Sequence, residues 1–340
     1  MYICSQRQVE KAGIFRMIDG YGRNIDYIRI SVTDKCNLRC TYCMPEEGTL
    51  SVSHEEILSY EEIIDLAAVF ASLGIDKIKL TGGEPLVRKN LSFLVSGLKQ
   101  VPGIHQVTLT TNGILLYEQM DELVSAGIDG INISMDTLNP QLFEKITRRD
   151  GLEKVLQGFH KALEYPQILL KINCVPMGIE GQNITDVAML AKKYPVHVRF
   201  IEMMPIGLGK QFMGQSQEMV LRELKLRFGE CRNSVNVQGN GPGHYYEFEG
   251  FCGKIGFISA VSHKFCDRCN RVRLTSEGFL KTCLQYETGT DLKRLLRQNS
   301  SETCIRNAIE EAVRKKPQGH QFGKLQNEDT ENRMMWQIGG

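Results

Sequence analysis

Short apolar runs alternate along the chain with longer stretches in which apolar residues recur every three or four positions. This alternation predicts strands separated by helices, and repeated strand–helix units favour a parallel sheet with helices on its outer face. The apolar runs predict strands at residues 27–32, 77–80, 106–110, 130–134, 168–175 and 196–201. The periodic stretches predict helices at residues 61–73, 91–101, 119–126, 152–165 and 185–194.

Six strand–helix repeats, fewer than the eight of a full barrel, predict an incomplete, open (β/α)6 TIM-like barrel over residues 19–214. A doubly wound flat sheet is the alternative that repeat counting leaves open. The repeat then stops, and mixed strand-like and helical runs predict a C-terminal α+β domain over residues 215–315. Residues 1–18 are expected to form a leader, and the polar residues 316–340 a flexible tail that ends in two glycines.

Single cations interrupt four of the predicted strands. Strands covered on both faces are nearly continuous apolar runs, yet Arg29, Lys79, Lys171 and Arg199 each lie between apolar neighbours. Side chains alternate between the two faces of a strand, so each cation is expected on the face opposite its neighbours. For any one of them, an edge or solvent-facing position is the alternative. Together they predict a positive barrel interior that holds an anionic ligand, because buried unpaired charge is costly.

Composition narrows the class of protein. The 340-residue chain is 42% hydrophobic and 24% charged, with a net charge of +1. These values are typical of a globular protein and argue against a general binder of nucleic acid or membrane surfaces. The sequence has neither a secretion-signal core nor an apolar run of about 18 residues, so a cytoplasmic protein is expected, although Arg7, Lys11 and Arg16 leave organelle targeting open. Six of the eleven cysteines form two tight groups, which indicates metal binding in a reducing compartment.

The first cysteine group directly follows the first predicted strand. Cys36, Cys40 and Cys43 have the spacing C-x3-C-x2-C. Thiolates on one short loop can converge on zinc, copper(I) or an iron–sulfur cluster. A structural zinc requires four ligands, whereas a 4Fe-4S cluster held by three cysteines keeps one iron open. The spacing alone does not identify the metal.

A glycine-rich turn, Thr81-Gly82-Gly83-Glu84-Pro85, follows the second predicted strand. Glycines let the backbone approach a ligand closely, and the Glu84 carboxylate is suited to an ammonium group. A turn that merely ends the strand is the alternative. Catalytic groups gather at the C-terminal ends of barrel strands, and polar residues also follow later strands at 110–113, 132–136 and 202–204.

The cysteine spacing and the glycine-rich turn together resemble the radical S-adenosylmethionine (SAM) enzymes. The resemblance implies a 4Fe-4S cluster on Cys36, Cys40 and Cys43, with SAM bound at the open iron through its amino and carboxylate groups. It also implies reductive cleavage of SAM to a 5′-deoxyadenosyl radical in a water-poor barrel. The SAM-site residues that it implies are Tyr42 beside the adenine, Gly83 and Glu84 at the methionine end, and Ser134 and Met204.

The second cysteine group has the spacing C-x2-C-x13-C and consists of Cys266, Cys269 and Cys283. Zinc and an iron–sulfur cluster fit this spacing equally well, and the nearby His263 is a candidate fourth zinc ligand. Arg271 and Arg273 share one face of an extended segment beside the group. Paired guanidinium groups suit phosphate, whereas two solvated surface arginines are the alternative.

Further motifs are similar to one family of this class, the GTP 3′,8-cyclases of molybdenum cofactor biosynthesis. They lie at residues 22–23, 29–36, 199–204 and 256–259, in the segment from Cys266 to Cys283, and in the terminal glycines. The resemblance implies a second 4Fe-4S cluster on Cys266, Cys269 and Cys283 whose open iron contacts guanine. The implied GTP contacts are Arg29, Lys79, Thr110, Lys171, Arg271 and Arg273, and Arg199 is assigned to the same site because it belongs to the positive barrel interior. The residues implied to support catalysis are Arg271, Arg273, Gly339 and Gly340.

The family resemblance also implies a reaction, that of a lyase. The radical removes the C3′ hydrogen of GTP, and C3′ then bonds to guanine C8. Reduction of the resulting aminyl-type radical gives 3′,8-cyclo-7,8-dihydro-GTP. A homodimer, a flavodoxin- or ferredoxin-type electron donor and a downstream cyclic pyranopterin monophosphate synthase are implied as partners.

Two other functions remain as alternatives to the cyclase. One is a radical SAM enzyme with a peptide substrate, which the cations of the predicted strands count against. The other is a zinc-stapled module that binds nucleic acid or protein, which the balanced charge and the predicted barrel count against. The chain departs from the cyclase family in residues 1–17, in residues 315–332 and at Ala260, where proline is common.

Overall fold

A run of six parallel strands in chain order forms the centre of the computed structural model, which describes residues 16–48, 53, 55–235, 239–322 and 331–339. All six predicted strands are present, with ends shifted by at most one residue. They are β1 (Tyr27–Ser31), β2 (Lys77–Thr81), β3 (Gln106–Thr111), β4 (Gly130–Ser134), β5 (Leu169–Cys174) and β6 (His197–Ile201).

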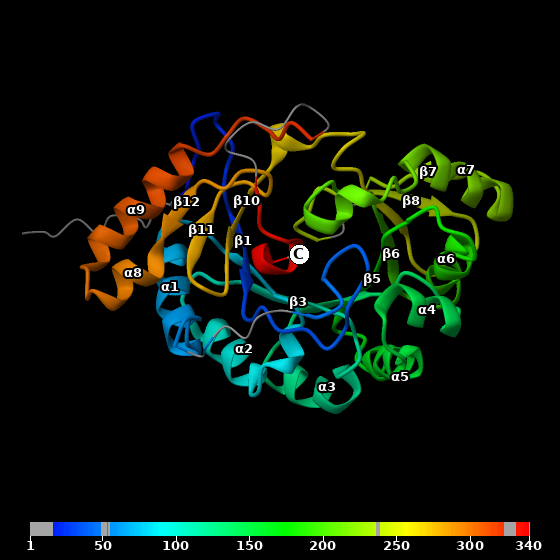
Figure 1. The fold of residues 1–340 in the computed structure, drawn as a ribbon, viewed down its shortest axis with the longest axis horizontal. Helices are drawn as coiled ribbons and strands as arrows, with labels where there is room; N and C mark the ends of the chain where they lie inside the picture. The colour runs from blue at the N-terminus through cyan, green and yellow to red at the C-terminus, as the bar shows by residue number, and fades with distance from the viewer. Residues whose placement is uncertain (1–15, 49–52, 54, 236–238, 323–330, 340) are drawn as a thin grey trace, which may run out of the picture.

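Helices connect these strands and cover the outer face of the sheet (Figure 1). Because consecutive strands are neighbours, the chain winds in one direction, as in a barrel, and the doubly wound alternative is wrong. The connecting elements are α1 (Tyr60–Ser72), η1 (Pro85–Val87), α2 (Leu91–Gln100), α3 (Leu116–Ser125), α4 (Pro140–Thr147), α5 (Leu152–Leu163) and α6 (Ile184–Lys193). Helix α4 was not predicted; it starts at a local signal, the Asn139 side chain that accepts the Leu142 N–H.

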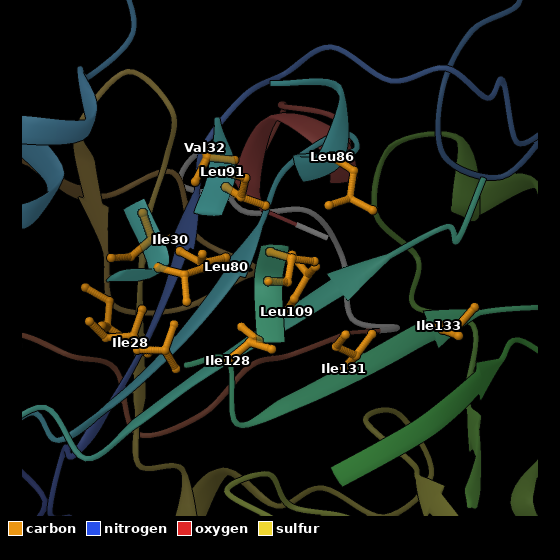
Figure 2. Packing of buried hydrophobic residues seen from close by; sticks show 14 of the residues in the cluster. Ile28, Ile30, Val32, Leu80, Leu86, Leu91, Leu109, Ile128, Ile131 and Ile133 are labelled. Carbon is orange, nitrogen blue, oxygen red and sulfur yellow. The ribbon is translucent and has the colours of Figure 1, made fainter. Parts of the chain in front are cut away.

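Apolar side chains on one face of the strands pack against the helices. Ile28 and Ile30 flank Arg29 in β1, and both are fully buried, as are Leu80 in β2 and Leu109 in β3. Figure 2 shows these four isoleucine and leucine side chains within one cluster. Since successive side chains alternate, the polar residues between them face the inside of the barrel.

The C-terminal part of the chain extends the sheet at both edges. β10 (Arg271–Leu274) pairs in parallel with β1, and β9 (Ile255–Ile258) pairs in parallel with β6. The strand order is β12-β11-β10-β1-β2-β3-β4-β5-β6-β9-β8-β7, so the sheet stays open, and the predicted incomplete barrel with a C-terminal α+β part is confirmed. The remaining elements are η2 (Gly207–Gln211), α7 (Gln217–Phe228), β7 (Cys231–Asn233), β8 (His244–Phe248), η3 (Cys266–Arg268), β11 (Phe279–Lys281), β12 (Gly289–Asp291), α8 (Leu292–Arg297), α9 (Glu302–Arg314) and η4 (Met335–Ile338).

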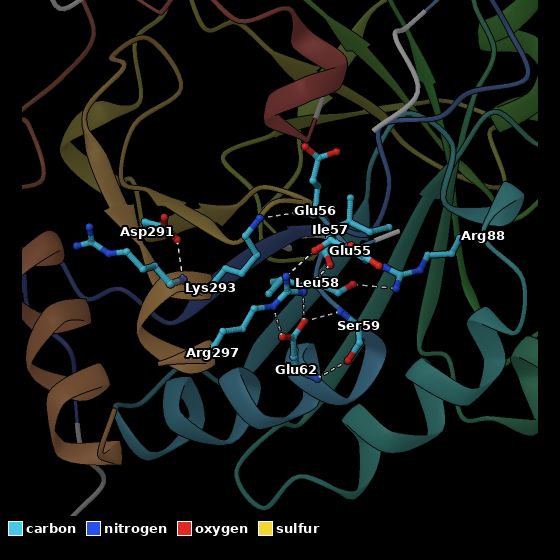
Figure 3. A network of polar contacts seen from close by, with 11 residues as sticks. Glu55, Glu56, Ile57, Leu58, Ser59, Glu62, Arg88, Asp291, Lys293 and Arg297 are labelled. Atoms are coloured by element: carbon cyan, nitrogen blue, oxygen red, sulfur yellow. Dashed lines mark hydrogen bonds and ion pairs between the residues drawn. The ribbon is translucent and has the colours of Figure 1, made fainter. Parts of the chain in front are cut away.

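A polar network fixes helix α8 of the C-terminal part against helix α1 of the barrel (Figure 3). Arg297 donates to both carboxylate oxygens of Glu62, at 2.7 and 3.0 Å, and to two backbone carbonyls just before α1. Glu62 also completes a capping box with Ser59 at the start of α1. On the other side, Arg88 donates to the Leu58 carbonyl at 2.8 Å. The network therefore holds the start of α1 from both parts of the chain.

The described part of the predicted tail is packed. The short turn η4 lies inside the barrel near the label C in Figure 1, with Trp336 8% exposed and Ile338 fully buried. Residues 1–15, 323–330 and 340 lie outside the described residues. The division into leader, barrel, C-terminal domain and flexible tail stays a prediction. Within the described ranges, no helix combines the length and apolar character needed to cross a membrane.

Candidate functional site

A cavity of about 350 Å³ lies on the inner face of the sheet, and both parts of the chain line it. Gly339 lies next to it, where its carbonyl accepts a hydrogen bond from Arg273 at 2.8 Å, and Gly340 lies outside the described residues. All other residues predicted for the site meet here. They are Arg29, Cys36, Cys40, Tyr42, Cys43, Lys79, Gly83, Glu84, Thr110, Ser134, Lys171, Arg199, Met204, Cys266, Cys269, Arg271, Arg273 and Cys283.

The first cysteine loop turns tightly after β1. The N–H groups of Cys43 and Met44 both donate to the Cys40 carbonyl, at 2.9 and 3.0 Å, and the backbone N–H of Trp336 donates to the Cys43 thiol. Burial, followed by nearby negative charge, raises the pKa of Cys36 to about 11 and that of Cys43 to about 12. Buried thiolates need a compensating positive centre, so this set of soft donors fits an iron–sulfur cluster.

The glycine-rich turn packs directly on the cysteine loop. The N–H of Gly83 donates to the Thr33 carbonyl at 2.7 Å, and the N–H of Glu84 donates to the Lys35 carbonyl at 2.8 Å. A Cβ atom on Gly83 would lie 2.4 Å from the Lys35 oxygen, and one on Gly82 would lie 2.5 Å from the Thr33 oxygen. Both positions therefore require glycine for the packing of the two loops, whatever ligand the turn contacts.

The Glu84 carboxylate is 1% exposed and braces the ends of β2 and β3. One oxygen accepts the Thr111 hydroxyl at 2.7 Å and the Leu86 N–H at 3.0 Å, and the other accepts the Asn112 N–H at 2.6 Å. Burial raises its pKa to about 7 against the effect of these bonds. The structure thus gives Glu84 a bracing role, and its contact with SAM stays a prediction.

Tyr42 is oriented by Asp136, which was not among the predicted site residues. The Tyr42 hydroxyl donates to Asp136 Oδ2 at 2.7 Å, and Asp136 Oδ1 accepts the Val175 N–H at 2.8 Å. The ring meets Phe212 edge to face, with centroids 6.5 Å apart. Burial raises the pKa of Asp136 to about 6. The position of Asp136 just after β4, where functional groups gather in barrels, was the available sequence signal.

A row of cations crosses the inner face of the sheet. Arg273 of β10 is in register with Arg29 of β1, which is in register with Lys79 of β2. Burial and then neighbouring cations lower the pKa of Lys171 to about 7 and that of Lys79 well below its usual value. The same two effects lower the pKa of Arg29 to about 10. A bound polyanion would stabilise this accumulated positive charge.

The second cysteine group is braced by residues far away in the sequence. Arg23 donates to the Cys266 carbonyl at 2.8 Å and pairs with Asp19 at 2.5 Å. Lys316 is buried and donates to the Arg271 carbonyl at 3.0 Å. Burial opposes ionisation of Cys269, but Lys316 and Arg271 outweigh it and lower the pKa of this thiol to about 7. Lys316 was missed because it is one of several lysines in a polar segment with no periodic signal.

The structure separates the two histidines near this group. His263 lies 3.3 Å from Glu218, and its side chain is 51% exposed, so it faces the surface instead of the cysteines. His320 lines the cavity, and its backbone N–H donates to the Cys266 thiol. No spacing pattern pointed to His320. Among the described residues, no three His, Cys, Asp or Glu side chains are gathered as they would be around a single metal ion.

The fold and the cysteine loop define a radical SAM protein. Residues 30–193 match the Radical SAM superfamily, and residues 196–322 match the family described as Molybdenum Cofactor Synthesis C. Among solved structures, Streptococcus suis SuiB bound to S-adenosylmethionine has a TM-score of 0.58. It is 11% identical, with 87% of this chain and 66% of that chain covered, so the likeness concerns the fold alone.

Sequence relatives then narrow the family. The GTP 3′,8-cyclase of Clostridium perfringens (strain SM101 / Type A) is 43% identical over 325 residues, which are 95% of this chain and 100% of the relative. The GTP 3′,8-cyclase of Syntrophomonas wolfei is 45% identical over 328 residues, with the same coverage. The chain belongs to the GTP 3′,8-cyclase family.

Proposed function

We propose that the chain converts GTP to (8S)-3′,8-cyclo-7,8-dihydroguanosine 5′-triphosphate in a SAM-dependent radical reaction, the first step of molybdenum cofactor biosynthesis. One observation carries the proposal: a single cavity is lined by two three-cysteine groups and by a row of cations that lies on its wall. Hydrogen transfer requires the radical source and the substrate to be held next to each other. This cavity offers cysteine thiolates for the radical source and cations for the substrate.

Two 4Fe-4S clusters and SAM are the proposed cofactors. Cys36, Cys40 and Cys43 would hold the first cluster, and the group that contains Cys266, Cys269 and Cys283 would hold the second. Bound in the first position, the cluster supplies the electron that cleaves the SAM sulfur–carbon bond and so provides the hydrogen-abstracting radical. The close packing of the glycine-rich turn on the first cysteine loop supports a SAM site at their junction.

The residues around that junction orient SAM. Tyr42, held by Asp136, presents its ring to the adenine. Gly83 and Glu84 face the methionine end, where the buried carboxylate has an unusually high proton affinity. Ser134 ends β4, and Met204 follows β6, so both lie at the same end of the barrel as the cysteine loop. These contacts are supported by their shared lining of the cavity.

The inner cations bind the triphosphate and ribose of GTP. Arg29, Lys79 and Lys171 supply charge, while Arg199 is fixed by two hydrogen bonds to Asn173, at 3.0 and 2.6 Å. Thr110, held by the Asn132 amide at 3.2 Å, adds a hydroxyl. Arg273 continues this row on β10, and Arg271 of the same strand lies beside Cys269 of the second cysteine group. The terminal Gly339 and Gly340 support the radical step, and the Gly339 carbonyl accepts from Arg273.

The proposed oligomeric state, location and partners of the chain rest on its similarity to the GTP 3′,8-cyclases and on its sequence. The chain is proposed to act as a cytoplasmic homodimer and to receive electrons from a flavodoxin- or ferredoxin-type donor. Its cyclised nucleotide would pass to cyclic pyranopterin monophosphate synthase.

Anaerobic reconstitution followed by dithionite, SAM and GTP tests the function. We expect 5′-deoxyadenosine together with a cyclised nucleotide. Formation of 5′-deoxyadenosine without any change in GTP would rule out the substrate. GTP affinity that survives charge reversal of Lys171 and Arg273 would favour a peptide substrate instead.

A further inference from the structure

A fully buried ion pair lies outside the machinery described above. Lys281 of β11 and Glu331 contact each other through Nζ and Oε2, and their side chains are 0% and 1% exposed. Removing two charges from water is costly unless further hydrogen bonds compensate. Here the Lys281 ammonium also donates to the Tyr286 carbonyl, and Glu331 Oε1 accepts the Arg333 N–H at 2.8 Å.

The pair stands at the start of the C-terminal segment, residues 331–339. The Glu331 N–H donates to the Gln285 carbonyl at 2.6 Å, which fixes the backbone at the same point. From there the segment enters the cavity, where Trp336 lines the wall and the Gly339 carbonyl accepts from Arg273. The only regular element of the segment is the four-residue turn η4. Because so short a helix is not stable alone, the segment depends on its anchors.

We propose that the Lys281–Glu331 pair is a positioning clamp, which sets where the C-terminal segment enters the cavity and thereby places the Gly339 carbonyl on Arg273. Both residues act through the segment, and neither lines the cavity. The catalytic consequence of the clamp rests on the proposed function, whereas the position of the segment does not.

The chemistry of the pair explains why a charge is used here. Two apolar side chains would stabilise the contact as well or better, but they would not specify which part of the segment lies against β11. The buried Lys281 ammonium instead requires a carboxylate or carbonyl oxygen to which it can donate. An alternative path of the segment leaves that ammonium without the Glu331 carboxylate, so alternative paths are penalised.

The chain contains its own reporter for this proposal. Trp336 is its single tryptophan, and it lies in the segment at 8% exposure, with its backbone N–H donating to the Cys43 thiol. Tryptophan emission and its quenching by acrylamide therefore report the docking of the segment without any turnover.

The test compares the reconstituted wild-type protein with Glu331→Gln, Lys281→Met and the exchanged pair Lys281→Glu/Glu331→Lys. Glu311→Gln is the matched control, since it breaks exposed ion pairs on α9. We expect each single variant to shift the equilibrium between the docked and the undocked C-terminal segment about a hundredfold toward the undocked state, as for a broken buried pair. Emission should move to longer wavelength, acrylamide quenching should rise, and GTP turnover should fall. The exchanged pair should recover most of the wild-type emission, and the control should match the wild type.

Unchanged emission and quenching in either single variant that still unfolds cooperatively would overturn the clamp. A shift of Trp336 emission to longer wavelength in the single variants that the exchanged pair does not reverse would also overturn the clamp. The shift would then not depend on the pairing of the two charges. A wild-type protein that shows docked Trp336 but no cyclisation would contradict the proposed function and leave this test intact.

Discussion

The pKa of Lys171 shows how strongly the cavity changes the ionisation of a single residue. It is 4% exposed, and burial and then Arg199 lower its pKa to about 7. The Tyr245 ring lies 5.9 Å from its ammonium. In the free protein this side chain therefore changes charge near neutral pH.

GTP affinity is expected to fall as pH rises above about 7. A bound triphosphate favours the charged ammonium, so binding above the free pKa takes up a proton, and affinity drops by up to about tenfold per pH unit. Calorimetric titration in buffers of different ionisation enthalpy measures both effects. Lys171→Arg keeps the charge and should remove this step while the titration of GTP itself remains. Wild-type and Lys171→Arg proteins with the same pH dependence would contradict the prediction.

Gly83→Ala should disable the first cysteine group. The added Cβ would meet backbone oxygens of Lys35 and Asp34 at 2.4 and 2.7 Å, so the cysteine loop must move. We expect reduced iron and sulfide content and at least about a tenfold loss of 5′-deoxyadenosine formation, because a small displacement of reacting groups costs that much or more. Ser96→Ala on helix α2 is the control. Normal iron content with normal SAM cleavage would show that the loop tolerates the side chain.

For single residues, the sequence predicts which side chains line the cavity better than it predicts which other side chains they contact. Inner cations such as Lys79 and Arg199 follow from their position between apolar neighbours, because alternation decides the face of a strand. Asp136 and His320 do not, because their contacts with Tyr42 and with the second cysteine group depend on the folded path of the chain.

Besides the pairing of β10 with β1 and of β9 with β6, side chains also join elements of the two parts of the chain. Arg297 of α8 reaches the capping box of α1, so the same Glu62 carboxylate starts one helix and holds another. Hydrophobic periodicity predicted α1 but not this link, since periodicity reports which face of a helix is buried and not which neighbour covers it. The start of α4 was missed for a related reason: a polar cap at Asn139 defines it.

Arg297→Met should lower the free energy of unfolding by about 1–2 kcal/mol, which is the loss of a partly exposed bidentate pair and of two bonds to backbone carbonyls. Arg297 lowers the pKa of Glu62, so this stabilisation is present above the ordinary glutamate pKa and is lost as pH falls. Chemical denaturation at neutral and acidic pH measures the difference. Arg314→Met, which breaks an exposed pair with Glu311, is the control. An equal loss of unfolding free energy in both variants would show that the Arg297 network stabilises the fold no more than an exposed ion pair does.

The whole molecule combines one barrel with two cysteine groups, and each group is expected to bind its own cluster. Full reconstitution should give about eight irons per chain, as for two 4Fe-4S clusters. Cys40→Ala should halve the iron and abolish SAM cleavage. Cys269→Ala should also halve the iron and stop cyclisation while SAM cleavage continues. Loss of all iron from either variant, or tightly bound zinc in the wild type, would contradict independent clusters.

The sheet order gives a second prediction for the whole molecule. A chain that ends at residue 214 keeps β1 to β6 but loses β10 and β9, which cover the two edges. Exposed edge strands pair with other chains. We expect this fragment to form large assemblies in size-exclusion chromatography, whereas the full chain does not. A monodisperse fragment would show that the six strands protect their own edges.

The pairing of β1 with β10 also has a consequence for biosynthesis. β1 leaves the ribosome long before β10 exists, because its residues lie near the start of the chain and those of β10 lie beyond Cys269. Until then β1 has a free edge and needs protection from neighbouring nascent chains. Arg271 and Arg273 arrive on that same late strand. Translation order alone therefore keeps the nucleotide cavity incomplete until most of the protein has been made.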